Sequence, residues 1–468
     1  MSWRVGSEGR RLLVLLTAVA VSMAVILAGA FVAPGSRSGV TGSGCGRSWQ
    51  AAPATATPIR HLFVIVKENH AFENYFGAYP GAIGNPPNGS FPVSFNGTAT
   101  VAPFPLTGTS TPSFPHDAAS ALEDYNHGQN NLFVAVASAA GIASPQDAVG
   151  YYTVAQLPAY YAYAHDYALG DQFFTGVLGP TYPNRVFDIS AANLSGWNAD
   201  TTPPSAVTDQ PTILGQLTQA NLSWFYDVQE SLPLPVAPGW FPALTSDPCS
   251  AGRVTDVSSL AAQLAAPDPP SVVFVDPSNS LSYSEHPPEN VTLGEEWTTA
   301  VVNTIFESPI ANSSAVLIFY DENGGYWDPV PPPMTSTGRD GFRVPFLALS
   351  PYTPPGRICP APIDPAAVLR FIDTNWGLPY LNARVATAGN LSCYFDFSQS
   401  PRPPVILPTG VSLGAPITSL PGPVPLSAPP RSPSPIGPAS PFAVARLPVG
   451  KGFWPRVPWA LRQEAEGS

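Results

Sequence analysis

The stretch that decides the fold is residues 314–328, which read SAVLIFYDENGGYWD. Its first half is a short apolar run rich in β-branched and aromatic residues, and such a run is typical of a strand buried on both faces. The run stops at Asp321 and Glu322, two acids that are unfavourable at the end of a buried strand unless a cation meets them. Gly324 and Gly325 then let the backbone turn sharply and approach a ligand closely. We therefore expect a bound cation at the end of this strand.

A second stretch has the same design. Residues 61–69 read HLFVIVKEN, an apolar run that ends in Glu68 and Asn69. Ligands of open α/β sheets bind beyond the carboxyl ends of the strands, so the polar residues of both runs converge if the runs are neighbouring parallel strands. All of them offer oxygen ligands, which suit a hard or borderline divalent cation. The alternative is that they are ordinary strand-end groups that cap helices or face water.

Strands and helices alternate along the rest of the chain. Further strands are expected at residues 223–226, 272–275 and 344–349, and helices at residues 116–125, 186–191, 292–305 and 365–376. This alternation predicts an α/β domain with a mainly parallel sheet. The strand at residues 272–275 again ends in an acid, Asp276.

The composition limits the classes of partner. The chain has 468 residues and a hydrophobic content of 44%, enough for a sizeable core. Its formal net charge of −12 argues against a nucleic-acid partner, which would need a basic stripe. Neutral or zwitterionic substrates remain open, and so do anionic ones if a metal inverts the local field.

The N-terminus indicates an extracytoplasmic chain. Basic residues precede an uncharged apolar run at residues 12–33. We expect residues 1–33 to be either a signal peptide or an uncleaved membrane anchor, with the bulk of the chain secreted or held at the outer face of the membrane. A flexible linker (34–58), a folded domain (59–405) and a Pro-rich C-terminal tail (406–468) are expected to follow.

Four cysteines fit no CxxC metal-binding spacing: Cys45, Cys249, Cys359 and Cys393. In an exported protein they form up to two disulfides, for which three pairings exist. Free buried thiols are the alternative.

Residues 179–185 read GPTYPNR and predict a turn bracketed by prolines, followed by a helix from residue 186. Thr181 is therefore expected just ahead of a helix start, with its hydroxyl at the positive end of the helix dipole. The alternative is an ordinary turn threonine.

Together these motifs resemble the phosphoesterase family that holds bacterial phosphatidylcholine-type phospholipases C and a group of acid phosphatases. The matching stretches, in the family's order, are residues 67–77, 179–185, 285–288, 320–333, 341–345, 369–379 and 395–399. The resemblance implies an alkaline-phosphatase-like fold, a three-layer α/β/α sandwich with a mainly parallel central sheet. It also implies an exported, metal-dependent hydrolase of phosphate esters, with phospholipid as one candidate substrate.

The resemblance implies roles for individual residues. Thr181 looks like the family's hydroxyl nucleophile, which would form a phospho-threonine intermediate. His116 and His286 look like the histidines that contact the phosphoryl group or protonate the leaving oxygen, and Asn69 is a further candidate for contact with the phosphate. The expected ligands of one divalent ion, with Ca²⁺, Mg²⁺, Mn²⁺ and Zn²⁺ all open, are Glu68, Asn69, Thr181, Asp321 and Glu322.

Two positions depart from the family pattern. Pro329 and Pro365 stand where many relatives carry histidine, and proline can neither bind a metal nor transfer a proton. We expect a phosphoesterase of phospholipase C type or acid phosphatase type. The alternative is a non-catalytic or substrate-shifted surface protein that retains the fold, and a third option is a hydrolase of sulfate esters. Three other histidines of the domain are assigned structural roles, namely His70, His127 and His165.

Overall fold

The computed structural model describes residues 54–413, except 85–86, 193–196, 202, 230–236, 251, 278–282 and 337. The expected signal or anchor segment, most of the expected linker and most of the expected tail lie outside these described residues. Within the described part of the chain, no helix has the length and apolar character needed to cross a bilayer.

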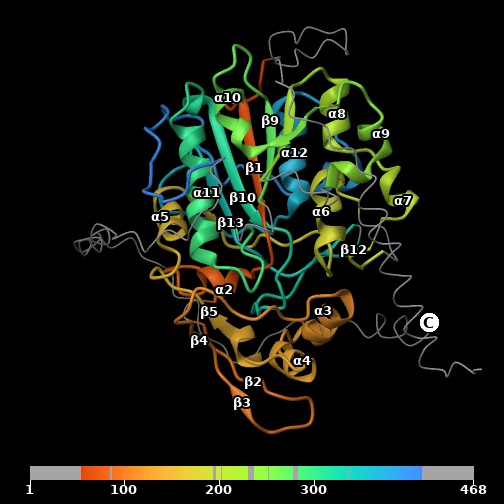
Figure 1. Cartoon of the computed structure of the whole chain (residues 1–468), viewed down its shortest axis with the longest axis vertical. Coiled ribbons are helices and arrows are strands. Elements are labelled where there is room, and N and C mark those ends of the chain that lie inside the picture. Colours follow the sequence, from red (N-terminus) through yellow and green to blue (C-terminus); the bar gives the residue numbers. More distant parts are fainter. Residues whose placement is uncertain are drawn as a thin grey trace, which may run out of the picture. The chain divides into compact units, whose positions relative to one another are not determined.

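An eight-stranded sheet forms the middle of the domain (Figure 1), in the order β14-β6-β13-β10-β1-β9-β7-β8. Its strands are β1 (His61–Lys67), β6 (Ala168–Gly170), β7 (Trp224–Val228), β8 (Val254–Asp256), β9 (Val272–Asp276), β10 (Ser314–Tyr320), β13 (Phe346–Leu349) and β14 (Arg357–Cys359). β13 runs antiparallel to β10 and β6, and the other neighbouring pairs of this sheet are parallel. The predicted mainly parallel sheet is confirmed.

The two apolar runs of the sequence are the central strands of this sheet. All 7 residues of β10 are buried, and β1 is buried except at His61. The two strands pair in parallel from His61 opposite Ser314 to Lys67 opposite Tyr320. Because both strands end at the same level, the polar residues that follow them come together at one edge of the sheet.

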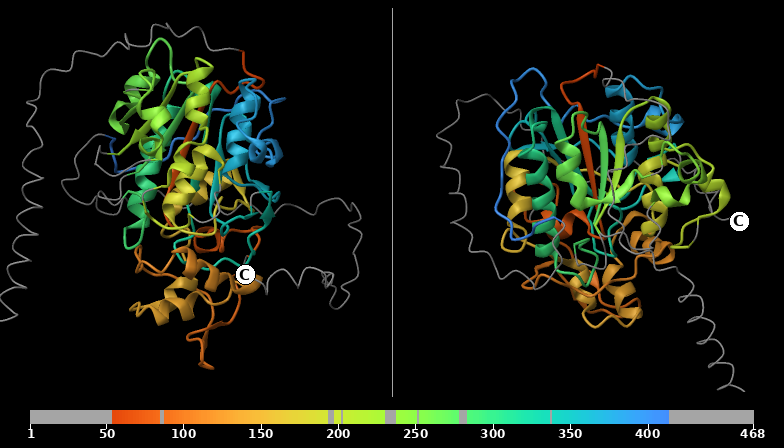
Figure 2. Two further views of the ribbon diagram at one scale, coloured as in Figure 1. Left: turned by 90° about the vertical axis from the view of Figure 1, so that its right-hand side faces the viewer. Right: turned by 45° about the horizontal axis from the view of Figure 1, so that its top comes forward.

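Helices cover both faces of the sheet (Figure 2). One face carries α5 (Pro158–Asp166), α10 (Leu260–Leu264) and α11 (Val291–Phe306), and the other carries α6 (Thr181–Ser190), α8 (Ile213–Gln219) and α12 (Pro365–Asn375). Shorter helices are α7 (Ser205–Thr208), α9 (Pro242–Thr245) and α13 (Ala383–Thr387). This three-layer α/β/α arrangement confirms the predicted fold class.

The chain between β1 and β6 builds an additional layer at the carboxyl end of β1 (orange to gold in Figure 1). It contains α2 (Phe72–Phe76), β2 (Phe91–Pro92), β3 (Thr100–Val101), β4 (Phe104–Pro105), α3 (Ala118–Tyr125), α4 (Phe133–Ala139) and β5 (Gly150–Tyr151). A second small core, which includes Phe114 and Phe133, joins this layer to Tyr326 and Trp327 beyond β10. The layer therefore holds its loops, including the one that carries His116, near the strand ends.

α6 begins earlier than the sequence predicted. We expected a helix from residue 186 with Thr181 ahead of it, whereas the helix starts at Thr181 with Pro180 as its N-cap residue. Pro183 fits inside the first turn because N–H groups there have no acceptor within the helix. Thr181 and Arg185 consequently lie one turn apart on the same side of α6.

Residues just outside the expected 59–405 domain also contact it. The backbone N–H of Ala56 donates to Asn375 O (2.8 Å). At the other end, Asn303 Nδ2 donates to Leu407 O (2.7 Å), and Thr409 Oγ1 donates to Glu296 O (2.7 Å). The contacts of the folded domain therefore extend past both expected boundaries.

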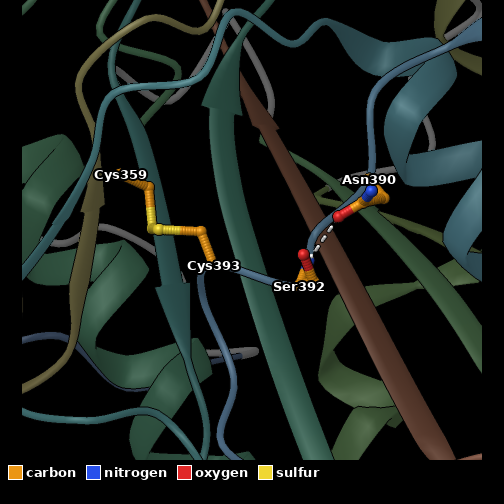
Figure 3. Close-up of a disulfide and its surroundings, with 4 residues drawn as sticks. All are labelled: Cys359, Asn390, Ser392 and Cys393. Atoms are coloured by element: carbon orange, nitrogen blue, oxygen red, sulfur yellow. Dashed lines mark hydrogen bonds between the residues drawn. A yellow bond between two sulfur atoms is a disulfide. The ribbon is translucent and has the colours of Figure 1, made fainter.

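Cys359 on β14 is disulfide-bonded to Cys393, 34 residues further along the chain (Figure 3). This bond ties an edge strand of the sheet to the segment that follows α13. No free cysteine occurs in the described part of the chain, so the free-thiol alternative does not apply there.

Candidate active site

One arginine joins the ends of the three central parallel strands. β10, β1 and β9 lead into Asp321, Glu68 and Asp276, respectively. Arg185 on α6 contacts Asp321 Oδ2 through Nε (3.2 Å), Glu68 Oε1 through Nη2 (3.1 Å) and Asp276 Oδ1 through Nη1 (3.3 Å). Its side chain is only 6% exposed, so the guanidinium is the buried counter-ion of the strand-end carboxylates. We assigned Arg185 no role from the sequence.

The acids of this cluster outnumber that single cation. Burial raises the pKa of Glu322 well above its usual range, and the charge of Asp321 raises it further. Burial also raises the pKa of Asp188 and of Asp276, although Arg185 lowers both. A further cation would relieve this excess of negative charge.

Three buried acceptors of this region have no hydrogen-bond partner among the described residues, namely Asn69 Oδ1, Glu322 Oε1 and Asp188 Oδ2. His116 Nδ1 donates to Phe114 O (2.7 Å), so in the neutral ring Nε2 is the acceptor for Asn69 Nδ2 at 3.3 Å. That contact turns Asn69 Oδ1 away from His116. Glu322 Oε1 lies 4.0 Å from the same His116 Nε2, so the unpartnered oxygens of Asn69 and Glu322 belong to one small region. Their chemistry fits a divalent cation with oxygen ligands.

The expected metal ligands are in two different situations. Both carboxylate oxygens of Asp321 are already bound, because Oδ1 accepts from the backbone N–H of Asn69 (3.2 Å) and of Glu322 (2.8 Å) while Oδ2 faces Arg185. Glu68 also contacts Arg185. Among the described residues, no group of three His, Cys, Asp or Glu side chains is arranged to hold a metal ion. The free ligand atoms for a metal at this edge are therefore those of Asn69 and Glu322, because Asp321 and Glu68 already bind Arg185.

The two glycines after β10 bring three loops together. Gly324 has a φ of +64°, and a Cβ there would lie 2.2 Å from Asn69 O. Gly325 has a φ of +71°, and its Cβ would lie 2.5 Å from Pro115 O. We expected these glycines to allow close approach of a ligand, but the groups that approach them are the backbones next to Asn69 and His116.

His116 and His286 form a pair whose ring centroids are 5.7 Å apart. Burial and the neighbouring His286 lower the pKa of His116, against the raising effect of its bond to Phe114, so His116 is neutral near pH 7. His286 donates from Nδ1 to Pro287 O (2.7 Å) and is half-buried. Burial lowers the pKa of His70 to about 3, which agrees with the structural role expected for it.

Thr181 is half-buried at the first position of α6. The next residue, Tyr182, donates its backbone N–H to Asp200 Oδ1 (2.8 Å). Burial and then Asp321 raise the pKa of Asp200, while His116 and His286 lower it. Asp200 therefore interacts both with the backbone at the start of α6 and with the charges of the two histidines. No motif or strand-end position in the sequence indicated Asp200.

The acids before Pro329 and Pro365 support the fold. Asp328 accepts from Arg343 Nε at 2.9 Å. Asp364 caps α12 by accepting from the backbone N–H of Ala366 (2.8 Å), and Pro365 occupies the first turn of that helix. Both prolines thus follow residues with clear structural partners.

The fold and the site define an α/β protein with an acidic site beyond the carboxyl ends of its central strands, the usual ligand position in such sheets. The model of the Phosphoesterase family matches residues 59–379. The chain therefore belongs to the phosphoesterase family, as predicted from its motifs.

Curated relatives are phospholipases C. The chain is 25% identical over 421 residues to the hemolytic phospholipase C of Pseudomonas aeruginosa, covering 73% of this chain and 56% of that protein. It is 26% identical over 424 residues to phospholipase C B of Mycobacterium tuberculosis, covering 75% and 80%, respectively. The chain thus spans little more than half the length of the Pseudomonas relative.

Similar solved structures are remote. They include a protein in the alkaline phosphatase superfamily from Vibrio parahaemolyticus (TM-score 0.39, 9% identity, 74% of each chain). Another is murine ectonucleotide pyrophosphatase/phosphodiesterase 5 (TM-score 0.37, 8% identity, 69% of this chain and 96% of that chain). At these scores we base the family assignment on the sequence match alone.

Proposed function

We propose that this chain is a metal-dependent phosphoesterase that uses Thr181 as its nucleophile. The observation that carries the proposal is that two buried oxygens among the strand-end carboxylates, Asn69 Oδ1 and Glu322 Oε1, have no hydrogen-bond partner in the described part of the chain. Membership of the phosphoesterase family and the names of the phospholipase C relatives support a phosphate-ester substrate. Asn69 and Glu322 would hold the ion, with Thr181 as a further expected ligand, and Glu68 and Asp321 would share their oxygens between the ion and Arg185.

When bound, a divalent ion would lower the pKa of the Thr181 hydroxyl and reduce the repulsion between the carboxylates and an anionic substrate. The position of Thr181 at the start of α6 adds to this effect, because the helix dipole favours negative charge there. The Thr181 hydroxyl loses its proton to solvent water, its oxygen attacks phosphorus in line, and the bond between phosphorus and the leaving oxygen breaks. Water then attacks the phospho-threonine, which restores the Thr181 hydroxyl and releases the phosphate product.

His116 and His286 have different roles in the proposed reaction. In neutral His116, Nδ1 and Nε2 are engaged by Phe114 O and the Asn69 amide, so this ring orients Asn69. His286 uses Nδ1 on Pro287 O, which leaves Nε2 to carry a proton to the leaving oxygen. We therefore assign the general acid to His286 and a positioning role to His116.

A phosphodiester with a cationic headgroup is favoured among the substrates by one further observation. The ring centroids of Trp240 and of Tyr182, the residue after Thr181, lie 4.8 Å apart, and both side chains are half-buried. The carboxylate of Asp200 contacts the backbone of the same Tyr182. Aromatic faces next to a carboxylate suit a quaternary ammonium group, as in a phosphorylcholine ester.

We further propose that the domain is exported and is either secreted or anchored at the outer face of the membrane. The basic and then apolar N-terminal segment supports export. The Cys359–Cys393 disulfide agrees with it, because such bonds persist in oxidising compartments. Protease treatment of intact cells tests this, since an exported domain is cleaved and a cytoplasmic one is protected.

The test of the activity compares p-nitrophenyl phosphate with p-nitrophenyl phosphorylcholine, each with and without chelator. The full-length chain is assayed beside Thr181→Ala, Thr181→Ser and a surface control, Thr387→Ala, whose exposed hydroxyl bonds the backbone of α13 and the side chain of Ser336. We expect chelator-sensitive turnover that Thr181→Ala abolishes, Thr181→Ser partly keeps and Thr387→Ala leaves unchanged.

The remaining outcomes separate the alternatives. Turnover of p-nitrophenyl sulfate in preference to both phosphates would replace the phosphoesterase by a sulfate-ester hydrolase. No turnover across pH and added Ca²⁺, Mg²⁺, Mn²⁺ or Zn²⁺, with retained binding of phosphorylcholine, would favour the non-catalytic surface protein.

A further inference from the structure

The residue before His286 is a fully buried carboxylate held by four donors. Glu285 is 0% exposed and lies 3.0 Å from Lys67 Nζ through Oε1. Tyr160 donates its hydroxyl to the same oxygen (2.7 Å), Tyr75 donates to Oε2 (2.6 Å), and Tyr320 also donates to Oε2. These donors come from α5, α2, β1 and β10, so the carboxylate is tied to the core on several sides.

The three tyrosine hydroxyls of this cluster keep their protons. Burial and the charge of Glu285 raise the pKa of Tyr75, Tyr160 and Tyr320 well above the usual tyrosine range. Burial lowers the pKa of Lys67, but Glu285 acts in the opposite direction. Both oxygens of Glu285 therefore have a full set of partners, which is the condition for a stable buried carboxylate.

The backbone around Glu285 is equally constrained. Glu285 has a φ of +73°, a conformation that is unfavourable for a residue with a side chain. Its carbonyl oxygen lies 2.8 Å from His70 Nε2, and the backbone N–H of Glu68 donates to Ser284 O (3.1 Å). Such an unusual backbone conformation persists where the surrounding contacts determine it.

The contacts on both sides of this loop come from one short segment. Lys67, Glu68 and His70 hold Ser284 and Glu285, and Asn69 between them contacts His116. The residues at the end of β1 therefore hold the loop that carries His286, and the same segment carries Asn69, whose side-chain amide is an expected metal ligand.

We propose that Glu285 is the positioning residue for His286: its buried, tyrosine-bound carboxylate holds the strained loop that places the His286 ring at the site. This inference rests on the proposed function, in which His286 protonates the leaving oxygen. Glu285 acts only through His286 and does not itself touch the substrate.

The test uses leaving groups that differ in their need for a proton. p-Nitrophenolate leaves without protonation, whereas an alkoxide requires it, so a displaced general acid affects alkyl esters most. In the full-length chain, kcat/KM of Glu285→Gln is measured on p-nitrophenyl phosphate and ethyl phosphate. If the wild type prefers diesters, the pair is p-nitrophenyl phosphorylcholine and glycerophosphocholine. Tyr75→Phe, which removes one donor and keeps the ring, serves as a milder variant.

We expect Glu285→Gln to lower kcat/KM about 10²-fold on the alkyl ester and less than about 10-fold on the p-nitrophenyl ester, as loss of general acid catalysis predicts. Tyr75→Phe is expected to lower kcat/KM on the alkyl ester more than on the p-nitrophenyl ester as well, but by a smaller factor. The matched control is Glu295→Gln, another buried glutamate, which accepts from the backbone N–H of Tyr160 (2.6 Å) on α5. It leaves the ratio of the two rates unchanged.

Equal losses on both esters, or no change in either variant, overturn the inference, because a smaller folded fraction lowers both rates alike. If His286→Asn changes the ratio and Glu285→Gln does not, the proposed function stands and only the role of Glu285 fails. If the wild type turns over no ester, the proposed function fails. NMR of labelled imidazole Cε1 then decides the role of Glu285, since the chain has only six histidines. A His286 resonance that moves in Glu285→Gln, while that of exposed His165 does not, supports it; an unchanged resonance overturns it.

Discussion

Replacing Arg185 by methionine tests how the three central strands hold their acids together. The change removes the guanidinium that lies within 3.3 Å of Glu68, Asp276 and Asp321 and keeps most of the apolar arm. Breaking one buried ion pair by removing a single partner costs about 3–5 kcal/mol, because a buried charge is left uncompensated. We therefore expect the free energy of unfolding to fall by at least about 3 kcal/mol near neutral pH.

The loss is expected to depend on pH. The pKa of Asp276 is raised by burial even while Arg185 lowers it, so removing Arg185 raises it further. A carboxyl group whose folded pKa lies above its unfolded pKa destabilises the protein at high pH, and protonation relieves this as the pH falls through the folded value. The gap between wild type and Arg185→Met should therefore be larger at pH 8 than at pH 5.

Urea unfolding followed by tryptophan fluorescence measures both effects. Arg185→Lys keeps the positive charge but not the planar guanidinium, so its free energy of unfolding is expected to lie between those of the wild type and Arg185→Met. The control is Arg357→Met, at an exposed position of β14, which should change stability by no more than about 0.5 kcal/mol. An Arg185→Met protein within about 1 kcal/mol of the wild type at pH 8 would refute the reasoning, because the strand-end acids would then not depend on this cation.

Three further predictions concern the site and its surroundings. Gly324→Ala places a Cβ 2.2 Å from Asn69 O, so it should reduce stability by about 1–3 kcal/mol and reduce turnover. Gly377 has a similar φ of +67°, but a Cβ there would have nothing within 4 Å, so Gly377→Ala adds backbone strain without a steric clash. Thermal unfolding of the two variants therefore separates the clash from the strain, and equal losses of stability would contradict the prediction. Trp240→Ala should raise KM for p-nitrophenyl phosphorylcholine roughly 2- to 30-fold, the range of a cation–π contact, with little effect on p-nitrophenyl phosphate; parallel changes for both substrates would argue against a headgroup site. Because the pKa of His70 falls to about 3 in the folded state, the unfolded state binds the proton first as the pH drops below about 6.5. Stability should then decrease by up to about 1.4 kcal/mol per pH unit between those values, and urea titrations of His70→Gln should show a shallower dependence than the wild type if this is correct.

The centre of the fold was predictable because its signals are local. The apolar runs at β1, β9 and β10 are long enough to be recognised as buried strands; β9 ends in an acid, and β1 and β10 are each followed directly by one. Parallel pairing of such runs places those acids at one edge, which is why the convergence of Asn69 and Glu322 could be expected. Of the added layer between β1 and β6, the helix at residues 116–125 was predicted, but its strands were not, since they have only two residues each and carry no periodic pattern.

The residues missed at the site depend on contacts between distant segments. Arg185 lies inside the motif at residues 179–185, but the motif alone does not show its role. That role depends on α6 starting at Thr181, which places the Arg185 side chain at the ends of three strands. Asp276 was recognised as a strand-end acid without a partner, because the order β10-β1-β9 cannot be read from the chain. The tyrosines around Glu285 come from three separate elements, so only the folded structure identifies their common acceptor.

The central claim is that Thr181 carries the phosphoryl group during turnover. The most direct measurement is acid quenching of the full-length chain during hydrolysis of p-nitrophenyl phosphate or p-nitrophenyl phosphorylcholine, followed by mass spectrometry of the peptide that contains Thr181. The account predicts one added phosphoryl-type group on Thr181, lost with chelator and absent in Thr181→Ala. Chelator-sensitive turnover that persists in Thr181→Ala, or a modification on any other residue, would contradict it.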